Sequence, residues 1–352
     1  MCIQKPTHSH FTMVQLNLRR RFSSSKEGLQ GVSKPSIRLP CLIFLIIFVV
    51  MTLQVPYDLS PSSSSSQSSS LSSTPSQNKN VWKSPHMIDC TQVDMPESEI
   101  FVLTTTKQTF FMNIHDPSSD EISRNIQKDG CWECPHIHSL EDAIEKHPDA
   151  SFLDIGGNIG MWTLTASALG RNTFTIEPNP LNYQRICRSI NRNGFHQVTH
   201  VLNIAATATP ASLKLSTPQG NMGGTSVHQV QEGDTSSDAV VQGVPIDQLG
   251  LPTDRPYVIK VDVEGFEMDT MAGSLEFLRQ ARIVYFAMEL RNHLLTSHPK
   301  TVEIFQLLSS KGLVPFRINY EDETPLDPKD LTQWIHFKHP NVRYFDVVWR
   351  LP

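Results

Sequence analysis

Residues 152–160 read FLDIGGNIG, and this stretch decides the fold. Strand-forming residues lead into glycines at positions 156, 157 and 160, and an apolar segment typical of a helix follows. Glycines at such a turn permit positive φ angles and let the backbone approach a ligand closely. The next helix offers free N–H groups at its amino terminus, and ligands of open α/β sheets bind beyond the carboxyl ends of the strands. The stretch predicts a ligand-binding turn, although a plain turn between strand and helix can contain the same glycines.

The next predicted strand, residues 173–176, ends at Glu177, 21 residues after Gly156. A carboxylate here can accept hydrogen bonds from both hydroxyls of a ribose, which indicates a cofactor that contains a nucleoside. A dinucleotide-binding turn would read G-x-G-x-x-G, but the glycines here are spaced G-G-x-x-G. Asp154, just before the turn, would repel a pyrophosphate, whereas S-adenosylmethionine has no phosphate and carries sulfonium and ammonium cations. Asp154 and Glu177 therefore favour S-adenosylmethionine as the cofactor.

Strands and helices alternate around this turn. Apolar runs predict strands at residues 100–103, 109–113, 151–155, 173–176, 198–204, 212–215, 240–244, 257–263, 283–289, 313–318 and 342–349. Helices are predicted at residues 119–128, 140–147, 159–169, 180–193, 267–278 and 301–310. Ser139 with Asp142 resembles a capping box that opens the second of these helices. The alternation predicts an α/β fold with a doubly wound, mostly parallel sheet and helices on both faces.

A second block, IKVDVEGFE at 259–267, places two carboxylates at the end of a predicted strand. Asp262 and Glu264 are two residues apart, so both can face one cleft if the strand runs that far. An alcohol oxygen is a weak nucleophile and needs a general base, for which these two are the best candidates. Two readings stay open beside this one: Glu264 can cap the following turn, or both carboxylates can be ligands of Mg²⁺. His228 and His293 are further base candidates, but each is more typical of a surface or loop residue.

Four motifs occur in an order that resembles the FkbM family of S-adenosylmethionine-dependent methyltransferases. They are DIGGNIG at 154–160, IEPNP at 176–180, GNMGGTSV at 220–227 and IKVDVEGFE at 259–267. GCWEC at 130–134 also resembles a Gly-x-Trp-Glu that precedes the first motif in that family. The resemblance covers roughly residues 100–350. It implies a Rossmann-like class I methyltransferase fold with a seven-stranded sheet, and O-methylation of a hydroxyl.

The resemblance also implies roles for single residues. The cofactor-binding residues would be Asp154, Gly156, Asn158, Gly160 and Glu177. Asp262 would lie at the end of the fourth strand, near the transferred methyl group. The sequence departs from the family at Gly157, where Ala is common, and we expect this only to loosen the turn. The polar segment 207–244 is expected to shape the acceptor pocket, because loops of this kind carry specificity.

Residues 39–53 form an uncharged, almost wholly apolar run, LPCLIFLIIFVVMTL, which the next two residues extend to 17. A helix rises about 1.5 Å per residue, so this run just crosses a hydrocarbon core of about 30 Å. Seven Lys and Arg precede it against Glu27 alone, so the positive-inside rule keeps the amino terminus cytosolic. We expect a signal anchor, with a cleaved signal peptide or an organelle transit peptide as alternatives. A buried core helix is disfavoured, because disordered-looking sequence lies on both sides.

The chain then divides into a basic cytosolic tail (1–38), a transmembrane anchor (39–55), a Ser- and Pro-rich stalk (56–84) and an FkbM-like domain (85–352). The stalk contains SPSSSSSQSSSLSSTPSQ, which cannot bury enough apolar surface to become ordered. A lumenal domain on such a stalk resembles the layout of Golgi glycan-modifying enzymes. We therefore expect a single-pass type II membrane protein of the Golgi or endoplasmic reticulum, with a lumenal catalytic domain.

Composition narrows the choice of function. The chain carries 30 Lys and Arg against 35 Asp and Glu, and no basic patch with interleaved aromatics appears, which argues against a nucleic-acid partner. Apolar residues make up 39% of the chain, enough for a core but not for a multi-span membrane protein. Six cysteines in this length exclude a disulfide-dense miniature scaffold.

The pair Cys131 and Cys134 allows several interpretations. A redox pair needs its first cysteine at a helix amino terminus, and the helix predicted to begin after Ser139 does not provide one. Zinc binding with His136 and His138 is possible, but no second paired cluster supports it, and no metal is expected. In a lumen, a structural disulfide among the folded part's four cysteines is favoured, with the pairing left open: Cys90, Cys131, Cys134 and Cys187.

We therefore expect a membrane-anchored, S-adenosylmethionine-dependent methyltransferase that acts on a hydroxyl of a small molecule, a glycan or a glycolipid. Two alternatives are a nucleotide-dependent oxidoreductase and a catalytically inactive methyltransferase-like binding module. The first would require a dinucleotide-binding turn, which is absent. The second would be expected to lose the glycine-rich turn or Glu177, and both are present.

Overall fold

A computed structural model of the chain describes residues 82–218, 224–229, 239–291, 300–319, 322–325, 327 and 344–352. The predicted tail and anchor, almost all of the stalk, His293 and part of the 220–227 loop lie outside these residues. Within the described ranges, no helix has both the length and the apolar character needed to cross a bilayer. All elements below belong to the unit that spans residues 76–352.

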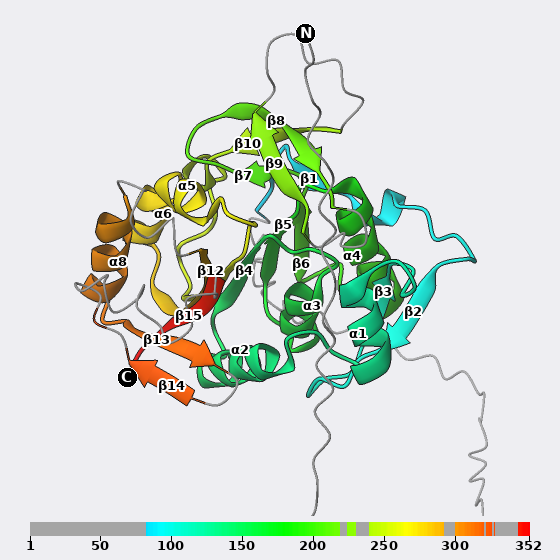
Figure 1. The fold of residues 1–352 in the computed structure, drawn as a ribbon, viewed down its shortest axis with the longest axis horizontal. Coiled ribbons are helices and arrows are strands. Elements are labelled where there is room, and N and C mark those ends of the chain that lie inside the picture. The colour runs from blue at the N-terminus through cyan, green and yellow to red at the C-terminus, as the bar shows by residue number, and fades with distance from the viewer. Residues whose placement is uncertain are drawn as a thin grey trace, which may run out of the picture. The chain divides into compact units, whose positions relative to one another are not determined.

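A nine-stranded sheet forms the centre of this unit (Figure 1). Its strands are β1 (Met87–Ile88), β4 (Ser151–Ile155), β5 (Thr173–Ile176), β6 (Thr199–Leu202), β11 (Tyr257–Val261), β12 (Ile283–Arg291), β13 (Val314–Asn319), β14 (Asp322–Pro325) and β15 (Tyr344–Arg350). Their order across the sheet is β1-β6-β5-β4-β11-β12-β15-β13-β14. The five neighbours from β6 to β12 are parallel, which confirms the predicted α/β class.

The strand order reverses at β4. The chain first builds outward through β5 and β6, and then returns to the other side of β4 with β11 and β12, as in doubly wound folds. The sheet is more mixed than the sequence predicts, because β15 inserts between β12 and β13 and is antiparallel to both. Short antiparallel strands at the two edges, β1 and β14, raise the predicted seven strands to nine.

Helices cover both faces of the sheet (Figure 1). One face carries α1 (Glu121–Asp129), α2 (Cys134–Lys146), α3 (Met161–Ala168) and α4 (Pro180–Asn193), and the other carries α5 (Glu267–Ala272), α6 (Leu275–Gln280) and α8 (Thr301–Ser310). Successive strand residues face opposite cores: Phe152 packs under α2 and α3, whereas Leu153 packs with α5 and α6. Asp154 and Lys260 continue the rows of Phe152 and Val258, and therefore point to the α2 and α3 face.

Two helices differ from their predicted bounds. The helix α2 begins at Cys134, not after Ser139, since a proline such as Pro135 fits the first turn. Ser139 lies inside this helix, where its hydroxyl is 3.0 Å from the hydroxyl of Tyr285. The helix predicted at 267–278 is divided into α5 and α6 at Gly273, where the chain passes so close to Thr207 that a Cβ would lie 2.0 Å from its carbonyl oxygen.

Two smaller sheets flank the centre. One is a four-stranded sheet of β7 (Ala205–Ala206), β10 (Val240–Val244), β8 (Ala211–Ser216) and β9 (Ser226–Gln229). Its last three strands belong to the described parts of the segment that was predicted to shape the acceptor pocket. Thr225, just before β9, accepts a hydrogen bond from Asn179 at 3.0 Å, so this sheet reaches the end of β5. The hairpin of β2 (Ile100–Leu103) and β3 (Phe111–Ile114) packs on α4, where Asn193 bonds the backbone of Phe111.

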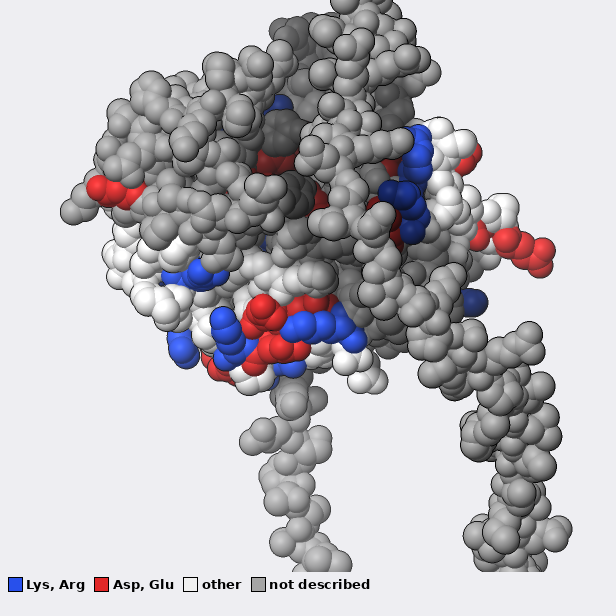
Figure 2. All heavy atoms as spheres, turned by 60° about the horizontal axis from the view of Figure 1, so that its bottom comes forward, with Lys and Arg blue, Asp and Glu red and all other residues white. Residues whose placement is uncertain are grey.

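Acidic and basic side chains lie interspersed on the described part of the face in Figure 2. Exposed ion pairs of Lys107 with Asp142 and Glu145, at 2.8 and 2.9 Å, are an example of this mixing. Pairs of this kind contribute about 1 kcal/mol or less to stability. Because acidic and basic side chains are mixed, the described surface on this face is neither mainly positive nor mainly negative.

Candidate functional site

The glycine-rich turn links β4 to α3 at the carboxyl edge of the sheet. Gly156 and Gly160 have φ angles of +87° and +96°, and Asn158 has +49°. The N–H groups of Gly156 and Gly157 both donate to the carbonyl of Ile176 on β5, at 2.9 and 3.0 Å. The turn is thereby fixed to β5, the strand that Glu177 follows. The sequence motif is thus a βα turn with left-handed backbone at Gly156, Asn158 and Gly160.

Two of these glycines are required by close packing. A Cβ on Gly156 would lie 1.7 Å from the carbonyl oxygen of Asp262, which follows β11. A Cβ on Gly157 would lie 2.3 Å from Oγ1 of Thr175. The expectation that Gly157 merely loosens the turn is wrong for this chain, because Thr175 occupies the space that an alanine methyl group would need.

Gly157→Ala should destabilise the fold by about 1–3 kcal/mol, the usual range for overpacking a core site. Replacing Thr175 with Ala should relieve this clash, since the buried Oγ1 has no hydrogen-bond partner among the described residues. Chemical denaturation of both single variants and of the double variant measures the coupling. Additive losses in the double variant would show that Thr175 is not the obstacle.

Asp154 acts on the turn from beneath. Its side chain is fully buried, and Oδ2 accepts a hydrogen bond from the hydroxyl of Thr163 on α3 at 2.6 Å. Oδ1 lies 3.8 Å from Nζ of Lys260. Burial raises the pKa of the Asp154 carboxyl, and Lys260 and Thr163 oppose that rise. Asp154 therefore connects the turn to α3 and β11, and its predicted contact with a cofactor stays a prediction.

Glu177 lies directly after β5 and is only 4% exposed. Its Oε2 accepts the N–H of Asn158 at 2.7 Å, and its Oε1 accepts the N–H of Asn179 at 2.9 Å. The amide of Asn182 makes a longer contact of 3.4 Å with Oε1. A carboxylate has about four acceptor positions, so one remains for a ribose hydroxyl. Burial raises the pKa of Glu177 to about 7, against these hydrogen bonds.

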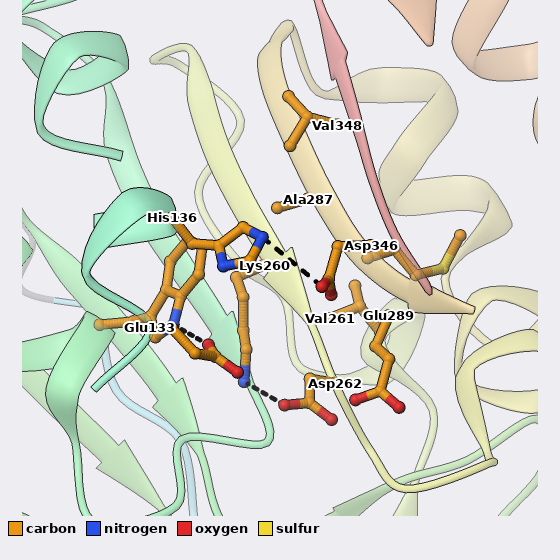
Figure 3. Close-up of a pocket in the computed structure, with 11 residues that line it drawn as sticks. Glu133, His136, Lys260, Val261, Asp262, Ala287, Glu289, Asp346 and Val348 are labelled. Atoms are coloured by element: carbon orange, nitrogen blue, oxygen red, sulfur yellow. Dashed lines mark hydrogen bonds and ion pairs between the residues drawn. The ribbon is translucent and has the colours of Figure 1, made fainter. Parts of the chain in front are cut away.

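A pocket opens beside the turn, on the α2 and α3 face of the sheet (Figure 3). It encloses about 310 Å³ including its open mouth. Its polar lining consists of Glu133, His136, Lys260, Asp262, Glu289 and Asp346. Of these the sequence identified Asp262 alone as a site residue. The predicted base and the predicted cofactor turn are therefore brought together, since the carbonyl of Asp262 also touches Gly156.

Three carboxyl groups of the pocket come from neighbouring strands. Asp346 on β15 is the register partner of Glu289 on β12. Val261 on β11 is paired with Met288, so Asp262 follows beside Glu289. Burial, together with the charges of Asp262 and Asp346, raises the pKa of Glu289 to about 9. The two neighbouring carboxyl groups therefore increase the proton affinity of the central one.

Glu133 and His136 enter the pocket from the start of α2. Glu133 has a φ of +53°, and its carboxylate accepts a hydrogen bond from the indole of Trp162 at 3.2 Å. His136 points toward Asp346, with 3.5 Å between Nε2 and Oδ2 (Figure 3). Burial lowers the pKa of His136, so its ring is neutral near pH 7. The GCWEC motif was a signal for Glu133. His136 was considered from sequence only as a zinc ligand, and nothing in the local sequence marked Glu289 or Asp346.

Glu264 does not share the pocket with Asp262. The strand β11 ends at Val261, and Glu264 follows in a turn with a φ of +54°. Its carboxylate accepts a hydrogen bond from Arg291 at 2.6 Å. Burial and the charge of Asp262 raise the pKa of Glu264 to about 7, while Arg291 lowers it. The turn-capping role considered for Glu264 belongs to Glu267, which accepts the N–H groups of Val263 and Gly265 at 3.3 and 2.9 Å.

The four cysteines of the folded part form two disulfides, Cys90 with Cys187 and Cys131 with Cys134. A zinc site that uses Cys131 and Cys134 as thiolates is incompatible with the second bridge. Across the described ranges, no group of three or more His, Cys, Asp or Glu is arranged to hold a metal ion. His228 is exposed on β9, where Nε2 is 3.4 Å from the hydroxyl of Ser226, and it does not line the pocket.

Part of the chain is similar to known methyltransferases. Residues 154–314 match the family profile described as "Methyltransferase FkbM domain", which confirms the resemblance found in the motifs. A hexuronic acid methyltransferase, AglP, of Haloferax volcanii is 24% identical over 158 residues, 44% of this chain. That match spans 64% of the relative, which is less than two thirds of its length.

Solved structures give weaker similarities. A precorrin-6y C5,15-methyltransferase of Geobacter metallireducens is 12% identical, with a TM-score of 0.33 over 68% of this chain and 98% of that one. An S-adenosylmethionine-dependent methyltransferase of Agrobacterium tumefaciens is 10% identical, with a TM-score of 0.37 over 76% of each chain. These TM-scores are low, so the assignment of the fold rests on the strand order of this chain's own sheet.

Proposed function

We propose that this chain, whose residues 154–314 carry a methyltransferase FkbM domain, transfers a methyl group from S-adenosylmethionine to a hydroxyl oxygen of a glycan or glycolipid. The proposal is supported by three features that lie together at one edge of the sheet. The glycine-rich turn, Glu177 after β5 and the carboxylate of Asp262 all lie at the carboxyl ends of neighbouring strands. A sugar acceptor is supported by the relative that is a hexuronic acid methyltransferase.

The residues at this edge fit S-adenosylmethionine. One acceptor position of Glu177 is left for a ribose hydroxyl, and Gly156 and Asn158 bring the backbone close to the same place. Glu133 and Asp262 line the adjacent pocket, and carboxylates stabilise a nearby cation. These residues would hold a ligand that is neutral at its ribose and positive beyond it. When bound, the cofactor supplies an electrophilic methyl group on a sulfonium.

The protein's own contribution is to orient the acceptor and to remove its proton. Transfer of a methyl group needs the acceptor oxygen in line with the C–S bond, and such positioning can lower the barrier by several kcal/mol. Asp262 lines the pocket beside the turn and is the favoured base. Glu264 is held by Arg291 outside the pocket lining and is the weaker candidate.

Calorimetry with S-adenosylmethionine and NAD tests the cofactor. We expect binding of S-adenosylmethionine, and Glu177→Ala should weaken it by about 1.5–3 kcal/mol, or roughly 10- to 150-fold in Kd. Glu276→Ala, at an exposed position of α6, is the matched control and should leave the Kd for S-adenosylmethionine unchanged. Binding of NAD instead would favour an oxidoreductase, and binding of neither would favour an inactive binding module.

The acceptor is tested by transfer of labelled methyl from S-adenosylmethionine to separated glycan, glycolipid and small-molecule fractions. Label in a sugar ether of the first two fractions supports the proposal, and label confined to protein or nucleic acid contradicts it. We also propose that a single span at 39–55 places the domain in the lumen of the Golgi or endoplasmic reticulum. Protease protection of the carboxyl-terminal domain in intact microsomes is the expected result.

A further inference from the structure

Lys260 on β11 is a buried cation for which no role was predicted from the sequence. It is 6% exposed and points into the pocket on the α2 and α3 face. A buried charge is strongly unfavourable unless ion pairs and hydrogen bonds compensate for the lost water. The contacts of its ammonium group therefore determine why a lysine stands here.

Those contacts join the two halves of the candidate site. Nζ of Lys260 donates a hydrogen bond to the carbonyl oxygen of Gly156, at 2.8 Å. It lies 3.3 Å from Oδ2 of Asp262 and 3.8 Å from Oδ1 of Asp154 (Figure 3 shows the contact with Asp262). One ammonium group thus touches the first residue of the glycine turn, the carboxylate beneath that turn and the favoured base.

The two carboxylate oxygens of Asp262 differ. Oδ2 faces Lys260, whereas Oδ1 is buried and has no hydrogen-bond partner among the described residues. An unpaired buried acceptor is unfavourable by about 1–3 kcal/mol, unless a ligand completes it. The lysine therefore leaves one oxygen of the base available to accept a proton in the pocket.

We propose that Lys260 is a positioning residue that holds the carboxylate of Asp262 against the glycine turn, so that its free oxygen receives the proton of the acceptor hydroxyl. This inference rests on the proposed function. In the step itself, the acceptor oxygen forms its bond to the methyl carbon, the C–S bond breaks with its electron pair leaving on sulfur, and the hydroxyl proton passes to Asp262.

The surrounding charges indicate that Lys260 does more than fill space beside Asp262. The carboxylates that act electrostatically on Lys260 come from separate elements: Glu133 before α2, Asp154 on β4, Glu177 after β5, Asp262 and Glu264 after β11, and Asp346 on β15. Asp262 also lies beside the carboxyl of Glu289 and near Glu267. Without the ammonium group the ionised acids of this cluster would repel one another, and nothing would hold the Asp262 carboxylate against the glycine turn.

The test compares Lys260→Met, which keeps most of the length of the side chain, with Lys260→Arg, which keeps its charge. Two readouts are used: labelled methyl transfer into a glycan and glycolipid fraction as a function of pH, and calorimetry of S-adenosylmethionine binding to the same samples. Lys260→Met should lower kcat about 100-fold and move the acid limb of the pH profile upward. Lys260→Arg should restore most of both.

The control is Lys311→Met, because Lys311 also donates to two backbone carbonyls but lies outside the pocket lining. It should leave kcat and the pH profile unchanged. If Lys260→Met fails to fold, Lys260→Gln keeps a donor for Gly156 without the charge and should show the same upward shift of the acid limb. An unchanged acid limb in either variant, or equal losses of kcat in the Met and Arg variants, overturns the inference. Absence of cofactor binding and methyl transfer in the wild-type protein counts against the proposed function, whereas an active wild-type protein whose Lys260 variants keep its acid limb counts against the role of Lys260 alone.

Discussion

Asp262→Asn should lower kcat for methyl transfer by about 10²–10⁴-fold, the usual contribution of a general base. The reason is the geometry of the pocket, in which one oxygen of Asp262 faces Lys260 and the other has no hydrogen-bond partner within the described part of the chain. An amide keeps the size of the side chain but cannot take the proton of an alcohol. The Kd for S-adenosylmethionine should change far less than kcat, because the ribose and the turn are contacted by other residues.

The measurement is single-turnover transfer of labelled methyl, with calorimetry of cofactor binding on the same samples. Glu264→Gln is the informative comparison, since both carboxylates are base candidates by sequence. It should cause a much smaller loss, because Arg291 holds the Glu264 carboxylate and Glu264 is not part of the pocket lining. Asp142→Asn, exposed on α2, is a surface control. A larger loss for Glu264→Gln than for Asp262→Asn would move the base to the turn after β11.

Gly156→Ala should nearly abolish cofactor binding. The new methyl group would lie 1.7 Å from the carbonyl of Asp262, so the turn or the end of β11 must move. A shift that removes hydrogen bonds worth about 3 kcal/mol raises the Kd for S-adenosylmethionine roughly 100-fold. The hydrogen bond from Lys260 to the carbonyl of Gly156 should be distorted by the same shift.

Gly170→Ala separates this clash from backbone strain. Gly170 has a φ of +75°, but a Cβ there meets no atom within 4 Å. It should therefore show the cost of a left-handed alanine alone, about 1–2 kcal/mol in the free energy of unfolding, with cofactor affinity kept. Calorimetry and chemical denaturation of both variants decide the matter. Equal cofactor affinity for Gly156→Ala and the wild type would exclude the turn from the site.

The parts of the site within one strand and its following turn were predictable from sequence. The turn at Gly156, the carboxylate at Glu177 and the carboxylate at Asp262 each follow a recognisable apolar run, and all three lie at the same sheet edge. Parallel strands of a doubly wound sheet end at that edge, so a local pattern is enough to bring them together.

Residues brought in by distant pairing were not predictable in this way. Asp346 reaches the pocket because β15 pairs with β12 in a register that sets it beside Glu289. That register depends on contacts between residues far apart in the chain, which no local spacing records. The start of α2 was predicted at the wrong residue for a related reason. Serine is a common helix-capping residue, but the hydroxyl of Ser139 contacts Tyr285 and does not cap a helix. The close approach of Gly273, where the predicted helix is divided, to Thr207 just after β7 is likewise a contact between residues far apart in the chain.

The position of β15 has a consequence for synthesis on the ribosome. Because β15 lies between β12 and β13 but follows both in the chain, β13 cannot take its final place when it emerges. The edge of β12 must stay unpaired until Trp349 and the other residues of β15 have been synthesised. Such non-local strand pairing is slow and leaves strand edges exposed. Chaperone dependence during translation should therefore concentrate on β12 and β13, and the pocket can be completed only after Asp346 has left the exit tunnel.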